Sequence, residues 1–322
     1  MSHIDPLPLA SIVVATYRSR RDHLRAALDS ALAQTWPRLE VIVSDDSPDD
    51  AVRELVAGIA DPRLRYLRNA PPLGVACNHW QAFAQSRGSY LAILNHDDWL
   101  APEFVARLIA PMQRDARIAV AFCDHWILGE DGRIDAARST ENTQRWGRAG
   151  LAGGLHLPFD GLVARQSIPV AMGALFRRDA LPAALPSDAG PAYDLWLAYL
   201  LCRPGAGAWY VDERLSGWRD HAANLSTAGG LDWLNGAATC WEAIAGDAAF
   251  DAQRARARTQ AARLHTACAG RAWARGRRGD CLRHAWRALR LQPGGRALAA
   301  LLLPILPVAA APARWRPRSI AR

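Results

Sequence analysis

An acidic pair in the first third of the chain has the residue types of a cation site. Asp97 and Asp98 come directly after the apolar run 90–94, and Asn95 stands two positions before Asp97. Mg²⁺ or Mn²⁺ binds one or two carboxylates and completes its shell with water and phosphate oxygens. An ion held here would stabilise charge that develops on a departing diphosphate. The alternative is that the pair caps a helix beginning near Pro102.

A second acidic pair, Asp45 and Asp46, follows the apolar stretch 39–43. A carboxylate at this position can accept hydrogen bonds from the N–H of a base or from a ribose hydroxyl. Ser, Pro and Asp are also ordinary turn residues, so an acidic turn is the alternative interpretation. Neither GxGxxG nor GxxxxGKS occurs in the sequence, which argues against dinucleotide-binding and P-loop folds.

Alternating strands and helices are expected to position these acids. Apolar, β-branched runs predict four strands, and residues at helical spacing follow each of them. This alternation predicts βαβ units and a mostly parallel α/β sheet flanked by helices, with ligands beyond the carboxyl ends of the strands. The predicted strands are 11–16, 39–43, 64–68 and 90–94, and the predicted helices are 21–34, 51–59, 75–85 and 102–112.

The second half of the chain shows weaker periodicity. Further strands are predicted over 118–127, 170–176 and 209–211, a helix over 192–201, and loops over 135–170 and 215–226. From about residue 230 the composition is rich in Ala and Arg, and two packed helices are predicted over 253–276 and 280–291. The predicted domains are 1–228, with halves of about 9–115 and 116–228, and a helical Arg-rich region, 229–322, with a tail at 298–322.

Charge is distributed unevenly along the 322 residues. The chain carries 39 basic and 31 acidic side chains, every basic one is Arg, and the net charge is +8. Residues 251–322 hold 16 Arg against Asp251 and Asp280, a net charge of +14, which leaves −6 for residues 1–250. The chain therefore combines an acidic body with a basic C-terminal segment, which excludes a uniformly basic protein.

Composition also bears on the compartment. Half of the residues are hydrophobic, which is incompatible with a disordered chain. Six Cys without a CxxC pair indicate reduced thiols and a cytoplasmic location. The first residues lack the features of a secretory signal. No uninterrupted apolar run reaches the roughly 18–20 residues that a spanning helix requires.

Five stretches, taken together, carry a resemblance to a known family. They are VVATYR at 13–18, QTWPRLEVIVSDDSPDD at 34–50, GVACNHWQAFAQSRGSYLAILNHDDWLAPEF at 74–104, AYDLWLAYLL at 192–201 and LSGWRDHAANLS at 215–226. Their order and spacing resemble family 2 glycosyltransferases of GT-A fold over about residues 9–226. The resemblance implies an inverting enzyme with a nucleotide-sugar donor, usually UDP- or dTDP-linked.

The resemblance assigns the donor side of the site first. It implies that Thr16 and Tyr17 line the nucleoside pocket and that Asp46 contacts the base or the ribose. Asn78 matches the family's Asn in the helix after the third strand. Asp98 matches the acid that supports donor binding.

The metal and the reaction follow from the same resemblance. Asp97 stands at the position of the metal ligand for Mg²⁺ or Mn²⁺, and Asn95 stands where the family's first acid usually stands. Asp194 matches the catalytic base; the alternative is a charge favoured at a helix N-terminus. Arg219 and His221 match the segment that closes over the diphosphate, and His221 is also a candidate metal contact.

Departures from the family pattern limit what can be transferred. Asn95 removes one negative charge from the metal site, so a donor-binding protein with weak catalysis is an alternative. Arg18, Cys77 and Tyr193 also replace common family residues. Donor identity is therefore left open.

The basic tail suggests a partner. Arg residues bracket the apolar stretch 298–311, which suits interfacial binding to anionic lipid. This predicts an enzyme peripheral on the inner face of the cytoplasmic membrane, acting on a saccharide or lipid-linked saccharide in bacterial polysaccharide assembly. The alternatives are that 301–306 packs on the protein, or that clusters such as 254–258 bind nucleic acid. No zinc finger or RNA-binding motif accompanies those clusters, so no nucleic-acid partner is expected.

Overall fold

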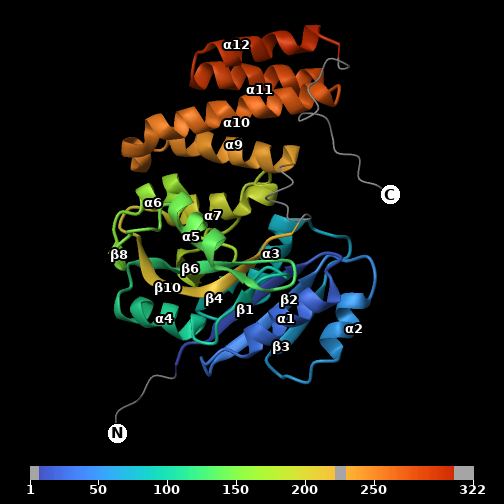
Figure 1. The fold of residues 1–322 in the computed structure, drawn as a ribbon, viewed down its shortest axis with the longest axis vertical. Coiled ribbons are helices and arrows are strands. Elements are labelled where there is room, and N and C mark those ends of the chain that lie inside the picture. The colour runs from blue at the N-terminus through green and yellow to red at the C-terminus, as the bar shows by residue number, and fades with distance from the viewer. Residues whose placement is uncertain (1–6, 222–229, 308–322) are drawn as a thin grey trace. The chain divides into compact units, whose positions relative to one another are not determined.

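The computed structural model describes residues 7–221 and 230–307 (Figure 1). The chain divides into two compact units. The first, called here the α/β unit, comprises Met1–Leu185 and Leu197–Asn224. The second, the helical unit, comprises Pro186–Trp196 and Leu225–Arg322. The predicted mostly parallel α/β sheet, flanked by helices and followed by a helical region, is confirmed.

The parallel half of the sheet begins the α/β unit. Every residue of β1 and β2 is buried, because β-branched and other apolar side chains fill both faces. β1 pairs in parallel with β2 and with β4, and β2 pairs with β3, so the order is β3-β2-β1-β4. The bounds are β1 Ala10–Thr16, β2 Leu39–Asp45, β3 Leu64–Arg68 and β4 Tyr90–Ile93.

Three helices connect these strands and a fourth follows them, and all four pack their apolar faces against the sheet. In α1 the side chains of Leu24, Ala27, Leu28 and Ala31 are buried at helical spacing. Because each crossover returns the chain to the same edge, the carboxyl ends of β1, β2 and β4 lie together. The bounds are α1 Arg21–Leu32, α2 Ala51–Ala57, α3 Val75–Gln85 and α4 Phe104–Arg114.

The other half of the sheet is mixed. β9 is antiparallel to both β4 and β6, and β10 runs parallel to β6. The long ladder between β6 and β10 carries two register shifts between Val211 and Ser216. The bounds are β5 Trp99–Leu100, β6 Ile118–Leu128, β7 Ile134–Asp135, β8 Gly154–His156, β9 Ala174–Arg177 and β10 Gly207–Arg219, with the short helix η1 at Arg178–Ala180.

Two predicted loops prove wrong in part. Residues 135–170 contain α5 (Ala136–Arg145), β8 and α6 (Asp160–Arg165), and residues 215–219 continue β10 rather than starting a loop. The segment of α5 is polar on all sides, so it lacks a helical hydrophobic pattern. Tertiary contacts hold it instead: the Ser139 hydroxyl accepts a bond from the backbone N–H of Ile127 in β6 at 2.9 Å. The rest of the second predicted loop, 222–226, lies outside the described residues.

The helical unit is a stack of helices rich in alanine. α10 packs on α9 and α11, and α12 packs on α11 and α10 (Figure 1). Ala269, Ala272 and Ala285 are fully buried, so small side chains bring the helix axes close together. The bounds are η2 Gly190–Ala192, α9 Leu231–Gly246, η3 Ala248–Gln253, α10 Arg254–Ala274, α11 Arg278–Leu291, α12 Gly295–Leu302 and η4 Leu303–Ile305. Helix α7, Tyr193–Leu201, begins in this unit and passes into the α/β unit at Leu197.

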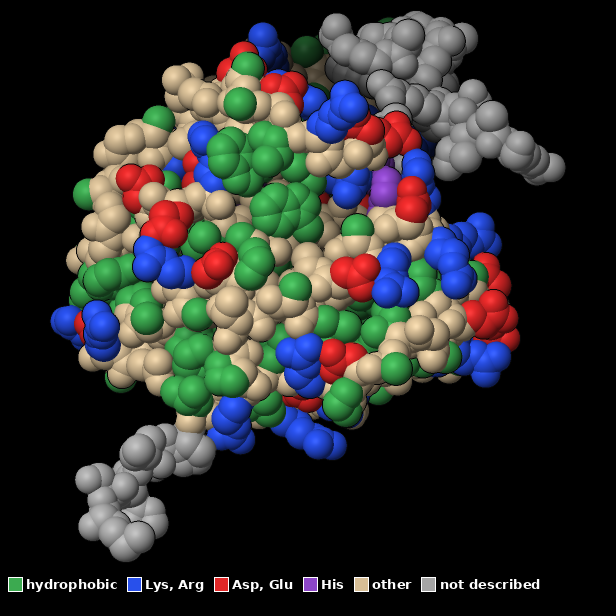
Figure 2. All heavy atoms as spheres, turned by 60° about the horizontal axis from the view of Figure 1, so that its bottom comes forward, with side chains coloured by type: hydrophobic (Ala, Val, Ile, Leu, Met, Phe, Trp, Pro, Cys, Tyr) green, Lys and Arg blue, Asp and Glu red, His purple; other side chains and the backbone are tan. Residues whose placement is uncertain are grey.

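Charged side chains of both signs share the face shown in Figure 2. Basic and acidic groups lie next to one another there, and no broad patch of one sign is formed. Exposed ion pairs occur in the α/β unit, such as Arg25 with Asp29 at 2.8 Å and Arg20 with Glu130 at 2.9 Å. Since a nucleic-acid surface requires a basic stripe, this face does not have the charge pattern of one.

Candidate active site

The two acids after β2 differ in what surrounds them. Asp45 is fully buried, and one of its oxygens accepts bonds from the Thr16 hydroxyl at 2.9 Å and the Ser47 backbone N–H at 2.8 Å. Its other oxygen accepts from the Tyr66 hydroxyl at 2.8 Å. Asp45 therefore links β1, β2 and β3. The partners of Asp46 lie instead in the loop between β3 and α3.

Asp46 lies beside the predicted nucleoside residues. Its carboxylate accepts from Asn69 Nδ2 at 2.9 Å and from the Gly74 backbone N–H at 2.8 Å. Asn69 Nδ2 is also 3.0 Å from the side-chain oxygen of Asn78, which donates through Nδ2 to the Thr16 carbonyl at 3.1 Å. The structure thus brings Thr16, Asp46 and Asn78 together, and adds Asn69.

Asn69 was not singled out by the sequence, although its position gave a signal. It is the first residue after β3, and so it occupies the same strand-end position as Asp46 after β2. Tyr17 also lies at this edge and is 54% exposed, with the Arg18 guanidinium 5.4 Å from its ring centroid. An exposed aromatic ring beside buried hydrogen-bonding groups has the character of a nucleoside site.

The second acidic pair shows the same division. Asp98 is 1% exposed, and its two oxygens accept from the Arg219 backbone N–H at 2.8 Å and from Asn95 Nδ2 at 2.9 Å. Burial, and then the adjacent charge of Asp97, raise the pKa of the Asp98 carboxyl well above its usual range. Asp98 therefore anchors the end of β10 to the strand-end loop, with no carboxylate oxygen left without a protein donor.

Asp97 also contacts the segment 219–221, through its carboxylate and its backbone carbonyl. Its carboxylate lies 2.7 Å from His221 Nε2, and its backbone carbonyl accepts from Arg219 Nε at 2.9 Å. Because a carboxylate only accepts, the Nε2 atom of His221 carries the proton in this contact. The structure thus brings together two segments that lie more than 120 positions apart in the sequence. One carries Asn95, Asp97 and Asp98, and the other carries Arg219 and His221.

The residues around Asp97 fit a divalent ion that arrives with a diphosphate. The carboxylate of Asp97 and the imidazole of His221 are adjacent, and Asn95 is held in the same loop by its bond to Asp98. In the described ranges no three His, Cys, Asp or Glu residues are arranged to hold an ion by themselves. Mg²⁺ or Mn²⁺ would therefore complete its shell with phosphate oxygens and water, as such ions commonly do.

Two further histidines surround this acid. The His23 ring lies 5.9 Å from the His221 ring, and His96 stands between Asn95 and Asp97. Burial lowers the pKa of both imidazoles, and the charge of Arg219 lowers that of His23 further. His23 is a residue that sequence reasoning missed, because it falls on the buried face of an ordinary amphipathic helix.

Asp194 belongs to the helical unit and is described within it. It opens α7, and one carboxylate oxygen accepts from the Leu195 backbone N–H at 2.8 Å. Burial raises the pKa of the Asp194 carboxyl. Both the start of α7 and the segment before it are held against α9, since Trp196 Nε1 donates to the Gly236 carbonyl at 3.0 Å and a Cβ at Gly236 would collide with the Ala189 carbonyl.

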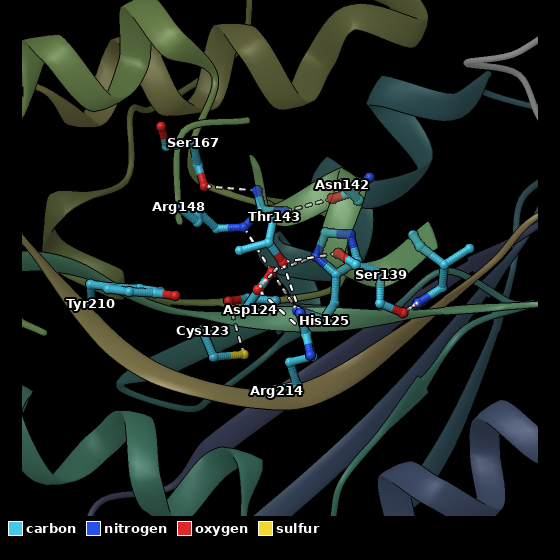
Figure 3. Close-up of polar contacts among 12 residues, drawn as sticks. Cys123, Asp124, His125, Ser139, Asn142, Thr143, Arg148, Ser167, Tyr210 and Arg214 are labelled. Atoms are coloured by element: carbon cyan, nitrogen blue, oxygen red, sulfur yellow. Dashed lines mark hydrogen bonds and ion pairs between the residues drawn. The ribbon is translucent and has the colours of Figure 1, made fainter. Parts of the chain in front are cut away.

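A buried polar cluster on β6, α5 and β10 was also missed (Figure 3). The Asp124 carboxylate accepts from Arg148 Nε at 2.8 Å and from the Thr143 hydroxyl, and Arg214 Nε lies 3.6 Å away. Arg148 also donates to the Asn142 side chain at 2.6 Å. Arg148 is 2% exposed, so its buried positive charge is offset by the Asp124 carboxylate rather than by water. The signal was a lone Asp inside the apolar run 118–128.

Comparison with known sequences identifies the family. The model of "Glycosyl transferase family 2" matches residues 11–181. The succinoglycan biosynthesis protein ExoO of Rhizobium meliloti is 40% identical over 134 residues, which cover 40% of this chain and 37% of that protein. The Escherichia coli UDP-Glc:alpha-D-GlcNAc-diphosphoundecaprenol beta-1,3-glucosyltransferase WfaP is 28% identical over 121 residues, 38% of this chain and 47% of that protein. The matches span less than half the length of both relatives.

Solved structures share the fold. S. aureus TarS 1–349 in complex with UDP superposes with a TM-score of 0.61 at 15% identity, covering 94% of this chain and 86% of that one. The mannosyltransferase PcManGT from Pyrobaculum calidifontis, in complex with GDP-Man and Mn²⁺, gives a TM-score of 0.58 at 17% identity, covering 96% and 82%.

The fold and the strand-end acids define a protein of the GT-A class. With the family model matching more than half of its residues, this chain belongs to glycosyl transferase family 2.

Proposed function

We propose that this chain transfers a sugar from a nucleoside-diphosphate donor to a saccharide hydroxyl, with inversion at the anomeric carbon. The observation that carries the proposal is the meeting of Asp97, Asp98, Arg219 and His221 beyond the sheet. This assembly lies in the same unit as the polar group of Thr16, Asp46 and Asn78. A charged site beside a hydrogen-bonding pocket suits a diphosphate joined to a nucleoside.

The donor would be held from two sides. Tyr17 would stack on the base, while Asp46 accepts a bond from the base or the ribose, with Asn78 and Asn69 fixing its orientation. Arg219 would place its positive charge beside the diphosphate, where charge develops as the bond to the sugar breaks. UDP- and dTDP-sugars are the proposed donors, and the complexes of TarS with UDP and UDP-GlcNAc support a uridine nucleotide.

Asp97, His221 and Asn95 would hold Mg²⁺ or Mn²⁺, with His221 losing the Nε2 proton that it now donates to Asp97, because a metal binds a deprotonated ring nitrogen. The bound ion supplies Lewis-acid stabilisation of the diphosphate leaving group. Imidazole ligands suit Mn²⁺ better than Mg²⁺, so His221 favours manganese. The Mn²⁺ in the complex of PcManGT supports the same choice. Asn95, which lacks the charge of an acid, favours the second candidate function, a donor-binding protein with weak catalysis.

Asp194 is the proposed general base. It would take the proton of the acceptor hydroxyl as that oxygen attacks the anomeric carbon, while the bonding electrons leave with the nucleoside diphosphate. Burial raises the pKa of this carboxyl, which increases its affinity for a proton. The Leu195 N–H fixes one oxygen of the carboxylate and leaves the other to accept the proton.

The acceptor is proposed to be a saccharide or lipid-linked saccharide of a bacterial cell-envelope polysaccharide. The names of two relatives support this class, one in succinoglycan biosynthesis and one acting on a diphosphoundecaprenol-linked sugar. We place the enzyme at the inner face of the cytoplasmic membrane, where nucleotide sugars and such acceptors meet. No described helix is both long and apolar enough to span a bilayer.

A donor screen tests the proposal. Purified protein is incubated with UDP-, dTDP- and GDP-sugars plus Mn²⁺, Mg²⁺ or EDTA, and release of nucleoside diphosphate is measured. We expect metal-dependent release from at least one donor, lost in Asp97→Ala and Asp194→Asn and kept in Asp29→Ala, an exposed acid paired only with Arg25. Donor binding without release or transfer would favour the weak-catalysis alternative. Absence of both binding and release would overturn the proposal.

A further inference from the structure

Large apolar side chains are exposed mainly near the end of the described chain. In α12 and η4, Leu298 is 53% exposed, Leu302 60%, Ile305 78% and Leu306 47%. Leu298 and Leu302 are one turn apart on α12, and Ile305 and Leu306 follow at the end of η4 and directly after it. We call this set the outer apolar face. On α11, Leu282 and Trp286 are exposed as well, at 45% and 56%.

The outer apolar face exposes large apolar side chains, whereas a surface helix usually exposes polar ones. α12 packs inward through small residues, since Ala297 and Ala300 are buried and the Cys281 thiol lies 3.9 Å from the Ala300 carbonyl. Leu301 packs partly against this cluster, whereas Leu298 and Leu302 are exposed to solvent. α12 is the last helix of the described stack (Figure 1). A contiguous exposed apolar surface of this kind marks an interaction site.

The charge around this face has one sign. No Asp or Glu occurs after Asp280, whereas Arg283, Arg287, Arg290 and Arg296 do occur on α11 and α12. Arg290 and Arg296 form no ion pair with any residue in the described ranges. A groove of about 760 Å³ between α10 and α12 adds Arg263 beside Arg296. These exposed cations give the surface a positive charge that an anionic partner would complement.

We propose that the outer apolar face, with Arg290 and Arg296, docks on the surface of an anionic lipid bilayer. An apolar helix face flanked by arginines lies in the interface, with its side chains among the acyl chains and its cations at the headgroups. The described helices are too short or too polar to cross the bilayer, which agrees with interfacial binding. This inference concerns a surface outside the donor site and does not depend on the proposed reaction.

Charge decides between the bilayer and other partners. A second copy that met this face symmetrically would bring unpaired arginines against each other, which is unfavourable. A nucleic acid would satisfy the arginines and leave the exposed leucines unused. An anionic bilayer satisfies both groups at once. Four more arginines, Arg314, Arg316, Arg318 and Arg322, follow in sequence and lie outside the described residues.

Vesicle flotation with the full chain tests the proposal. The probes are vesicles of phosphatidylcholine alone and of phosphatidylcholine mixed with phosphatidylglycerol. We expect binding only to the mixed vesicles. Leu302→Asp with Ile305→Asp should weaken it by about 100-fold or more, since each side chain contributes ~1.5 kcal/mol or more when buried. Arg290→Gln with Arg296→Gln should weaken it roughly 30-fold, at about 1 kcal/mol per arginine.

Matched controls lie in the α/β unit. Ile134→Asp replaces an apolar residue that is 51% exposed, and Arg133→Gln replaces an arginine whose side chain is 90% exposed. Both should bind mixed vesicles like the wild type. Because all substituted side chains are exposed, circular dichroism melts should be unchanged, and UDP affinity in solution should be unchanged too. Loss of vesicle binding with intact UDP binding separates this inference from the proposed function.

Three outcomes would overturn the inference. The first is equal binding to neutral and anionic vesicles, and the second is equal loss in the control variants. The third is an absence of vesicle binding together with a wild-type dimer in analytical ultracentrifugation. If Leu302→Asp with Ile305→Asp dissociates that dimer, the face belongs to a contact with a second copy.

Discussion

The α/β unit contains charged side chains that are buried and paired, whereas the last helices of the helical unit expose leucines and two arginines, Arg290 and Arg296, without ion-pair partners among the described residues. Asp98 has both oxygens bonded at 1% exposure, and Asp124 holds the buried charge of Arg148. Leu302 and Ile305 are 60% and 78% exposed, and Arg296 has no ion-pair partner among the described residues. The first arrangement fixes groups for chemistry on a small ligand, and the second presents a surface to a large partner.

Carboxylates within the α/β unit have two different uses. At each strand end one acid is consumed by internal bonds, Asp45 after β2 and Asp98 in the loop after β4. The adjacent acid bonds to a different segment, Asp46 to Asn69 and Gly74 and Asp97 to His221, and is the acid proposed to contact the donor or its metal. An internal anchor beside such an acid keeps it in place. This is the preorganisation that binding a charged ligand requires.

The largest effect is expected at the general base. Asp194→Asn keeps the shape of the side chain and removes its ability to take a proton, so transfer should fall by about 10²–10⁴-fold. Rapid-quench measurement of sugar transfer gives the rate, and UDP affinity should be unchanged because Asp194 has no assigned role in donor binding. A variant that transfers sugar at the wild-type rate would remove Asp194 from the mechanism.

The next effect concerns stability and tests the buried pairs of the α/β unit. Asp124→Ala leaves the Arg148 guanidinium buried without its carboxylate, which should lower the free energy of unfolding by about 3–5 kcal/mol. Urea denaturation followed by tryptophan fluorescence measures this change. Asp29→Ala, which breaks an exposed pair, should cost less than about 1 kcal/mol. Equal losses in the two variants would contradict the contrast between buried and exposed charge.

A pH effect is expected in the helical unit. His284 Nδ1 lies 3.0 Å from His265 Nδ1, and burial lowers the pKa of His284 to about 4. The unfolded state, with an ordinary pKa near 6.5, then binds more protons than the folded state, so stability falls as pH drops from about 6.5 to 4. This single group contributes at most about 3 kcal/mol. The other charged groups facing the pair are Glu242, Arg283, Arg287 and Asp280.

Denaturation at pH 7 and pH 4.5 measures this loss, with His284→Gln as the comparison. Glutamine has an amide in place of the imidazole and does not titrate, so the variant should lose less stability than the wild type between the two values. The same loss in both proteins would assign the acid sensitivity to other buried histidines, such as His125, whose pKa burial lowers to about 3.

The smallest effect on stability is expected for an exposed side chain of the helical unit. Leu302→Asp changes an exposed side chain, so the free energy of unfolding should move by no more than about 0.5 kcal/mol. Leu28→Asp, at a fully buried position of α1, should prevent folding or destabilise it severely. Thermal melts of both variants make the measurement. A large loss in Leu302→Asp would mean that the outer apolar face is packed in solution.

The parallel half of the sheet was predictable because each strand and helix there carries its own hydrophobic pattern. α5 was not, since Ala136–Arg145 is polar on all sides and depends on contacts such as that between Ser139 and Ile127. Residues 215–219 were missed as strand because their pairing partner, β6, is far away in sequence. Such contacts between distant segments leave no local pattern.

The predicted site residues of the α/β unit meet in two groups, although the sequence alone gives neither their partners nor their distances. A family motif indicated Asp97 and His221, but their contact at 2.7 Å follows only from the fold. Asn69 and His23 sit at positions that carry no motif, and Asp124 is visible only as a polar residue within an apolar strand. The catalytic and binding roles of all these residues remain predictions.

The central claim is that Asp97 and His221 assemble a metal and a nucleoside diphosphate in one site. Calorimetric titration of UDP into the protein, with and without Mn²⁺, tests it most directly, with Asp97→Asn as the matched variant. We predict that Mn²⁺ tightens UDP binding at least about tenfold and that Asp97→Asn abolishes this gain. An equal UDP affinity with and without Mn²⁺, or an unchanged gain in the variant, would contradict the account.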